Sequence, residues 1–195
     1  AVDRPIHDAT GLPGVLYTSA AALTLERQQV FARGWTAIAF ASEVAEPGAV
    51  RAVDWLGEPL LLSRDRHGQL RVFHNVCSHR GHKLVAGECH ANGGVLRCPY
   101  HAWTYGLDGQ LRGTPHIGGT GIHEAPGFDR GRHGLREVRS HVWLDLVFVN
   151  LDGAAPAFED WLAPLTARWQ PFWGEQGWEA LTPDRDGEQQ LRVAA

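Results

Sequence analysis

The sequence of 195 residues lacks three features that mark large classes of proteins. It has no run of 18 apolar residues, so we predict no membrane-spanning helix. It has no basic stripe: 18 Lys and Arg are interspersed with 22 Asp and Glu, and the formal net charge is −4, which excludes electrostatic support for nucleic-acid binding. The apolar residues at 12–25 follow no basic segment and are interrupted by Pro13, Gly14 and Thr18, so we expect no signal peptide.

Cysteine is also scarce, with three residues in the whole chain. An odd number leaves at least one thiol without an intramolecular disulfide, which favours a reducing, cytoplasmic location. We expect Cys89 to be a loop thiol without a ligand role. Histidine is plentiful, but the last one is His141.

The other two cysteines lie in two short motifs, Cys77-Ser-His79 and Cys98-Pro-Tyr-His101, and 18 residues separate His79 from Cys98. Two Cys and two His can hold either a zinc ion or an iron–sulfur cluster. A zinc finger usually has two Cys in one arm and two His in the other, with at least two residues between them. Here each arm is mixed and the first has one intervening residue, which suits two neighbouring metals better than one. A structural zinc module stays open as an alternative.

This stretch resembles the N-terminal Rieske [2Fe–2S] domain of ring-hydroxylating oxygenase α subunits. That family carries C-x-H-R-G and C-x-Y-H-x-W, which stand here as Cys77-Ser-His79-Arg80-Gly81 and Cys98-Pro-Tyr100-His101-Ala102-Trp103. Ala102 departs from the Gly that is more common in the family. The resemblance implies that one iron is held by Cys77 and Cys98 and the other by His79 and His101.

The neighbouring residues receive supporting roles in this interpretation. We expect Arg80 to orient the cluster loops or to dock a carboxylate, and Tyr100 and Trp103 to exclude water. Gly81 and Gly93-Gly94 would let the backbone approach the sulfides. Membrane-complex Rieske proteins have a Ser hydroxyl bonded to a cluster sulfur where this chain has Trp103. We therefore predict a reduction potential in the lower part of the Rieske range.

Short β-branched and aromatic runs between turn signals predict a mostly β fold, an antiparallel β-sandwich flanked by short helices. The cluster would sit on two loops at one end of a small four-stranded subdomain. A helix should begin at Thr18 or Ser19, reach about Arg33 and pack on this domain, and a second, containing Pro164, should follow residue 157. The predicted strands are 36–41, 49–55, 59–65, 70–75, 94–97, 103–107, 110–112, 135–141 and 142–150, and the tail at 191–195 should begin another.

We divide the chain into an N-terminal arm and helix (1–34), the Rieske domain (35–152) and a linker, helix and start of a truncated catalytic domain (153–195). In the family a C-terminal domain carries a mononuclear Fe(II) on two His and one carboxylate. Because no histidine follows His141, we expect that site to be absent from this chain and the chain to be a fragment or truncated family member.

The resemblance implies an oxidoreductase, the electron-transfer part of a mono- or dioxygenase. Single electrons would come from a reductase or ferredoxin and pass to the mononuclear iron of the same or a neighbouring α subunit, in a possible homotrimer. A free-standing Rieske ferredoxin is the second hypothesis. The extra helices count against it, since a minimal carrier needs neither.

Overall fold

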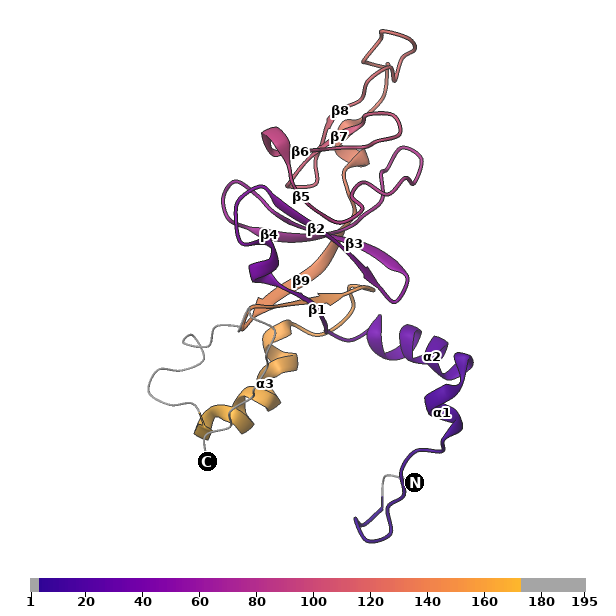
Figure 1. The fold of residues 1–195 in the computed structure, drawn as a ribbon, viewed down its shortest axis with the longest axis vertical. Coiled ribbons are helices and arrows are strands. Elements are labelled where there is room, and N and C mark those ends of the chain that lie inside the picture. Colours follow the sequence, from indigo (N-terminus) through magenta and orange to yellow (C-terminus); the bar gives the residue numbers. More distant parts are fainter. Residues whose placement is uncertain (1–3, 173–195) are drawn as a thin grey trace.

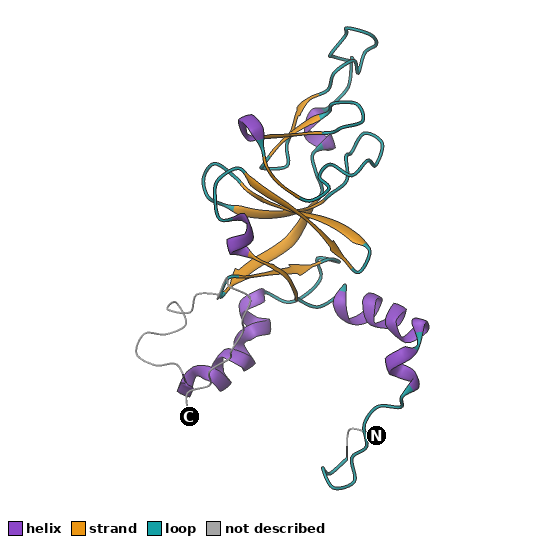
Figure 2. Cartoon of the chain, viewed as in Figure 1, coloured by secondary structure: helices purple, strands orange, loops and turns teal. Residues whose placement is uncertain are grey.

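A computed structural model describes residues 4–172 of the chain, which form an antiparallel β body with helices at one end (Figure 1). The large sheet has seven strands in the order β1-β10-β9-β4-β3-β2-β5. Figure 2 shows these strands in the middle of the molecule and loops at the end opposite the helices. The strands are β1 (Thr36–Phe40), β2 (Ala49–Trp55), β3 (Glu58–Arg64), β4 (Leu70–His74), β5 (Glu88–His90), β9 (Glu137–Trp143) and β10 (Leu146–Asn150).

The two halves of the large sheet are joined through β9, which pairs with β4 near its start and with β10 along the rest. One buried apolar cluster therefore combines Val147 and Val149 of β10 with Leu60 and Leu62 of β3. Strands from the two halves of the sheet thus share one core, as in a sandwich. The predicted mostly β, antiparallel fold is confirmed.

The smaller sheet has three strands, not the four that we predicted, in the order β6 (Val95–Arg97), β7 (Thr104–Gly106) and β8 (Leu111–Gly113). The strand that precedes it, β5, pairs with β2 instead and so belongs to the large sheet. Its residues Glu88, Cys89 and His90 are exposed and give no alternating pattern, which is why the sequence did not reveal it. The small sheet packs on the large one through Tyr105, Phe73 and Leu61, which share one core cluster.

Most strand boundaries agree with the sequence to within one or two residues, and β2 agrees at both ends. The exception is the turn before β10, which we placed after His141 and the structure places at Leu144-Asp145. Both turn residues have left-handed backbones, with φ of 50° and 68°. The sequence has neither Gly nor Pro there, so the usual turn signal is missing.

The N-terminal helical segment is correct in position but wrong in its predicted packing. Ser19 caps α2 (Ala20–Glu26) by accepting the Ala22 N–H at 3.3 Å, after a short α1 (Val15–Thr18), and a π-helical turn over Arg27–Phe31 follows. None of these helices contains a buried residue. The expected apolar face contacts the β body at Phe31, whose ring meets Trp55 edge-on at 6.2 Å, while Leu23 and Val30 stay exposed. The helices project away from the sheets (Figure 1).

The predicted C-terminal helix is present as α3 (Phe158–Trp169) and contains Pro164. Phe158 and Leu162 are buried against Phe148 of β10 and against Trp35, which directly precedes β1. Every helix within residues 4–172 is too short or too polar to span a lipid bilayer. The strand that we predicted at 191–195 lies outside the described residues.

Candidate metal centre

Two loops at the end of the molecule opposite the helices hold the four predicted ligands. The first follows β4 and carries Cys77 and His79; the second joins β6 to β7 and carries Cys98 and His101. Both cysteines are 2 % exposed and neither forms a disulfide. The Cys98 thiol lies close enough to the Cys77 thiol to contribute to the rise in its pKa. The two motifs, remote in sequence, are therefore brought together by the fold.

The surroundings of the Cys77 thiol disfavour its negatively charged form. Burial is the main cause that raises its pKa, and the neighbouring Cys98 adds to the rise. The thiolate, the form that ligates metals, is thus disfavoured in this pocket unless positive charge sits beside it.

The two imidazoles lie next to each other, with ring centroids 4.7 Å apart and ring planes at 76°. The Nδ1 atoms of both His79 and His101 are buried, and neither has a hydrogen-bond partner in the described part of the chain. A buried polar atom without a partner is costly, so both positions are suited to a ligand bond. Burial, followed by the charges of His101 and Arg80, lowers the pKa of His79 and favours the neutral ring that a metal needs.

Backbone hydrogen bonds hold each loop in a tight turn. In the first, the Cys77 N–H donates to the His82 carbonyl at 2.8 Å and the Gly81 N–H donates to the Cys77 carbonyl at 2.9 Å. In the second, the Cys98 N–H donates to the Trp103 carbonyl at 2.8 Å and the Ala102 N–H donates to the Cys98 carbonyl at 3.0 Å. Each loop therefore folds its Cys and His toward the same side.

Asn75, which is fully buried just before the first loop, ties the base of that loop to its far end. Its Oδ1 accepts the N–H groups of Leu84 and Val85, both at 3.1 Å, and its Nδ2 donates to the Val85 carbonyl at 2.7 Å. We missed this residue from the sequence. Its position directly after a strand and two residues before a ligand was the available signal, since Asn favours such turns.

Tyr105 of β7 is a second residue that the sequence analysis missed. Its hydroxyl lies 3.1 Å from Cys77 Sγ, accepts the Ser78 N–H at 3.1 Å and lies 2.9 Å from Ser78 Oγ. Burial and the contact with Cys77 raise the pKa of Tyr105, so the hydroxyl keeps its proton. The ligand sulfur therefore does have a hydroxyl neighbour, although Trp103 cannot supply one.

The predicted supporting residues differ in how they meet the site. Trp103 is buried and stacks on His79 at 4.7 Å with an interplanar angle of 10°. The Tyr100 ring contacts His101, with ring centroids 3.7 Å apart, but is 59 % exposed, so it flanks the site. Arg80 is exposed at the rim.

The predicted glycines lie in two different places. Gly81 has a φ of 71°, a left-handed backbone that favours glycine, and no other protein atom lies within 4 Å of where a Cβ would stand; its approach to the sulfides stays a prediction. Gly93 and Gly94 lie between β5 and β6 and line a different pocket. Our expectation that they approach the cluster is wrong.

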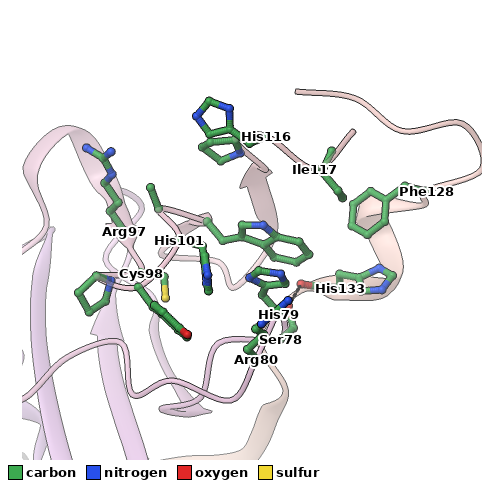
Figure 3. Close-up of a pocket in the computed structure, with 15 residues that line it drawn as sticks. Ser78, His79, Arg80, Arg97, Cys98, His101, His116, Ile117, Phe128 and His133 are labelled. Carbon is green, nitrogen blue, oxygen red and sulfur yellow. Dashed lines mark hydrogen bonds between the residues drawn. The ribbon is translucent and has the colours of Figure 1, made fainter. Parts of the chain in front are cut away.

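Both histidines open onto a surface pocket of about 1140 Å³ (Figure 3). Trp103, Ile117 and Phe128 form its apolar wall. The Ser78 hydroxyl donates to the His133 carbonyl at 2.6 Å and ties that wall to the first loop. Cys98 also lines the pocket, but it and Cys77 are each only 2 % exposed, so the histidine side is the face of the site that meets solvent.

Comparisons with known proteins agree on what this arrangement is. Residues 34–126 match the model of the Rieske [2Fe–2S] domain. The chain belongs to the Rieske oxygenase α-subunit family and corresponds to the N-terminal part of its members.

Individual relatives make this more specific. The chain is 37 % identical over 162 residues to the carnitine monooxygenase oxygenase subunit of Escherichia coli K12, which covers 83 % of this chain and 42 % of that protein. It is 34 % identical to the glycine betaine monooxygenase oxygenase subunit of Chromohalobacter salexigens, over 83 % of this chain and 35 % of that protein. The chain thus spans about two fifths of the length of these relatives.

Solved structures show the same likeness. The apo form of a quaternary ammonium Rieske monooxygenase superposes with a TM-score of 0.72 at 33 % identity, over 84 % of this chain and 46 % of that one. Naphthalene 1,2-dioxygenase with bound indole gives 0.65 at 27 % identity, over 77 % of this chain and 33 % of that one.

The residues present fit the [2Fe–2S] cluster that a Rieske domain implies. The fit rests on two adjacent buried thiols and two unpartnered buried imidazole nitrogens. In residues 4–172 no three His, Cys, Asp or Glu side chains are grouped as ligands of a single metal ion. A two-iron cluster requires only two protein ligands at each metal.

Proposed function

We propose that this chain is the electron-transfer part of a Rieske oxygenase α subunit. The observation that carries the proposal is the pairing of buried Cys77 and Cys98 with the unpartnered Nδ1 atoms of His79 and His101. In this proposal the thiolates hold one iron and the imidazoles the other. A bound [2Fe–2S] cluster accepts and returns one electron at a time, at a higher potential with two His ligands than with four Cys.

Neighbouring residues shield the site and tune its ligands. Binding through Nδ1 leaves Nε2 of His79 and His101 to carry the ring proton on the pocket side. Trp103 covers one face of His79, and the hydroxyl of Tyr105 can donate to the Cys77 sulfur. Donation to a ligand sulfur stabilises the more negative, reduced state.

The electron would come from a reductase or ferredoxin and pass to a mononuclear non-haem iron. Residues 142–195 contain no histidine, so we place that iron in a catalytic domain of the same or a neighbouring subunit. A structure of a related quaternary ammonium monooxygenase was described in terms of inter-subunit electron transfer, which supports the second arrangement. The homotrimer, the domain division at residues 35–152 and the cytoplasmic location stay predictions.

Likeness to the carnitine and glycine betaine oxygenase subunits favours a quaternary amine as the substrate of the whole oxygenase. In the full-length oxygenase that carries this domain, supplied with electrons, we expect oxygen consumption on adding carnitine or glycine betaine. Consumption with naphthalene and with neither amine would refute this assignment.

The test of the electron-transfer role is to count iron, acid-labile sulfide and zinc in the purified chain and to titrate it with dithionite. We expect equal iron and sulfide, a visible absorption that bleaches, and uptake of one electron per chain. Cys98→Ser should lose the cluster, whereas the matched change at exposed Cys89, Cys89→Ser, should keep it. Stoichiometric zinc without sulfide would establish the zinc module instead. Substrate oxidation by the chain alone would refute the proposed division of labour.

A further inference from the structure

The charges of this acidic chain are unevenly distributed. Residues 76–134 include both cluster loops and the small sheet, and they hold six Lys or Arg against four Asp or Glu. All other residues together hold twelve against eighteen, which leaves the chain at −4. The segment that carries the candidate metal centre therefore has a net positive charge, and the remaining sequence has a net negative charge.

The acidic groups at this end are largely neutralised or engaged. Asp108 pairs with Arg112 at 2.5 Å, and Glu88 lies 3.1 Å from Arg51 of β2. A carboxylate oxygen of Asp129 accepts the N–H of Gly131 at 2.9 Å. Only Glu124 of the four is without such a contact in the described residues.

Five of the six basic groups, in contrast, are unpaired in the described residues and lie on the segments that line the pocket or flank its lining. Arg80 and Arg97 line it (Figure 3), and the others lie on the first loop or on the short helix between the pocket-lining Phe128 and His133. All are exposed, and within residues 4–172 none forms an ion pair. This basic rim consists of Arg80, Lys83, Arg97, Arg130 and Arg132.

An exposed aromatic side chain stands inside the rim. Tyr100 is 59 % exposed and contacts His101, and Pro99 beside it is also exposed. Tyrosine and arginine are enriched at the energetic centres of protein interfaces. The histidine face therefore combines an aromatic contact point with a positive border.

Resting on the proposed function, we propose that the basic rim docks the electron-donating protein through an acidic face on that protein. Electron transfer needs a close approach, and the cysteine side of the centre is buried. Long-range electrostatic attraction raises the association rate of a donor that binds and dissociates by diffusion. A permanent contact between subunits does not depend on an association rate. This is why we assign the rim to the donor and not to the acceptor domain.

Small redox ions of opposite charge test the field at the site. The dithionite-reduced chain is mixed in a stopped-flow instrument with ferricyanide or with hexaamminecobalt(III), each of which takes one electron from it. The rate with ferricyanide should fall with added salt and the rate with hexaamminecobalt(III) should rise. We test the single variants Lys83→Gln, Arg97→Gln and Arg130→Gln. Each should lower the rate of electron transfer to ferricyanide about threefold at about 10 mM ionic strength and leave it nearly unchanged at about 1 M.

The matched control is Arg27→Gln, which removes an exposed charge from the helical end. It should change neither rate. A loaded cluster whose rates with the two ions respond to salt in the same direction would overturn the inference while the proposed function stands. A chain that cannot be loaded with a cluster would overturn both.

A protein probe then tests the donor assignment. The oxidised chain is mixed with a reduced, strongly acidic plant-type [2Fe–2S] ferredoxin. We expect the three rim variants to be reduced more slowly than the wild-type chain and Arg27→Gln to be reduced at the wild-type rate. The rim variants could react more slowly with ferricyanide and still be reduced by the ferredoxin at the wild-type rate. That result would show that the rim serves a different partner and would refute the assignment.

Discussion

The hydroxyl of Tyr105 lies 3.1 Å from the sulfur of Cys77, across 28 residues of sequence. The tyrosine is fully buried and also accepts the Ser78 N–H. A side chain in the small sheet thus reaches the proposed ligand of the first loop. This contact links the packing of the domain to the electronic properties of the centre.

We expect Tyr105→Phe to lower the reduction potential because the sulfur loses a donor in the reduced state. A hydrogen bond worth about 1 kcal/mol corresponds to roughly 40 mV for one electron. Redox titration followed by the visible spectrum measures it, with Tyr100→Phe at the exposed tyrosine as the control. A potential that stays at the wild-type value would show that Tyr105 does not donate to the sulfur.

Ala102 has a φ of 60°, a left-handed conformation that costs a non-glycine residue about 1 kcal/mol. This is the position where the sequence departs from the Gly common in the family. We therefore expect Ala102→Gly to raise the free energy of unfolding by up to about 1 kcal/mol, the gain being reduced by the entropy of glycine in the unfolded chain. Urea unfolding of both proteins tests this, and a loss of stability would contradict it.

Asn75→Ala removes the side chain that closes the first loop and leaves two buried N–H groups without their acceptor. We expect the free energy of unfolding to fall by about 2–3 kcal/mol and iron to be released faster. Chelator-induced loss of visible absorption measures the release. Asn92→Ala, at an exposed asparagine outside the loop, should leave both quantities unchanged.

His74 gives the stability a defined pH dependence. Burial, and then the charge of Arg136, lower the pKa of His74 below its ordinary 6.5, with Glu58 opposing. Between the folded pKa and 6.5 only the unfolded chain binds this proton, so its contribution to stability is complete above 6.5 and is lost as the pH falls through that window.

The measurement is urea unfolding at about pH 7.5 and about pH 5.5 for the wild-type chain and His74→Gln. We expect the difference between the two pH values to be smaller in the variant, because the other histidines titrate equally in both proteins. Equal differences would mean that His74 is not responsible.

The sequence predicted those parts of the fold that local patterns determine. β2 is a short run rich in apolar residues between two turn signals and was placed correctly at both ends, and Ser19 was identified as a candidate helix cap. The turn at Leu144-Asp145 was missed because its residues adopt left-handed backbones without glycine. β5 was missed because its pairing with β2, and not its own sequence, makes it a strand.

In the candidate site too, local motifs were predicted and contacts between remote residues were not. Spacing within the two motifs was enough to select Cys77, His79, Cys98 and His101. Their support was predicted in part, because Trp103 was expected to exclude water. Only the three-dimensional structure shows that Trp103, Tyr105 and Leu107, in and beside β7, share one core cluster and that the Tyr105 hydroxyl meets Cys77. The amphipathic pattern of the N-terminal helix likewise gave no information on what its apolar face contacts.

The most direct test of the account is to identify the ligands of the reduced centre. Pulsed electron paramagnetic resonance on a chain grown with ¹⁵N-labelled histidine detects nitrogens bound to the paramagnetic cluster. The account predicts coupling to two histidine nitrogens, both Nδ1, from His79 and His101. A cluster spectrum without histidine coupling, or no paramagnetic cluster after reconstitution and reduction, would contradict it.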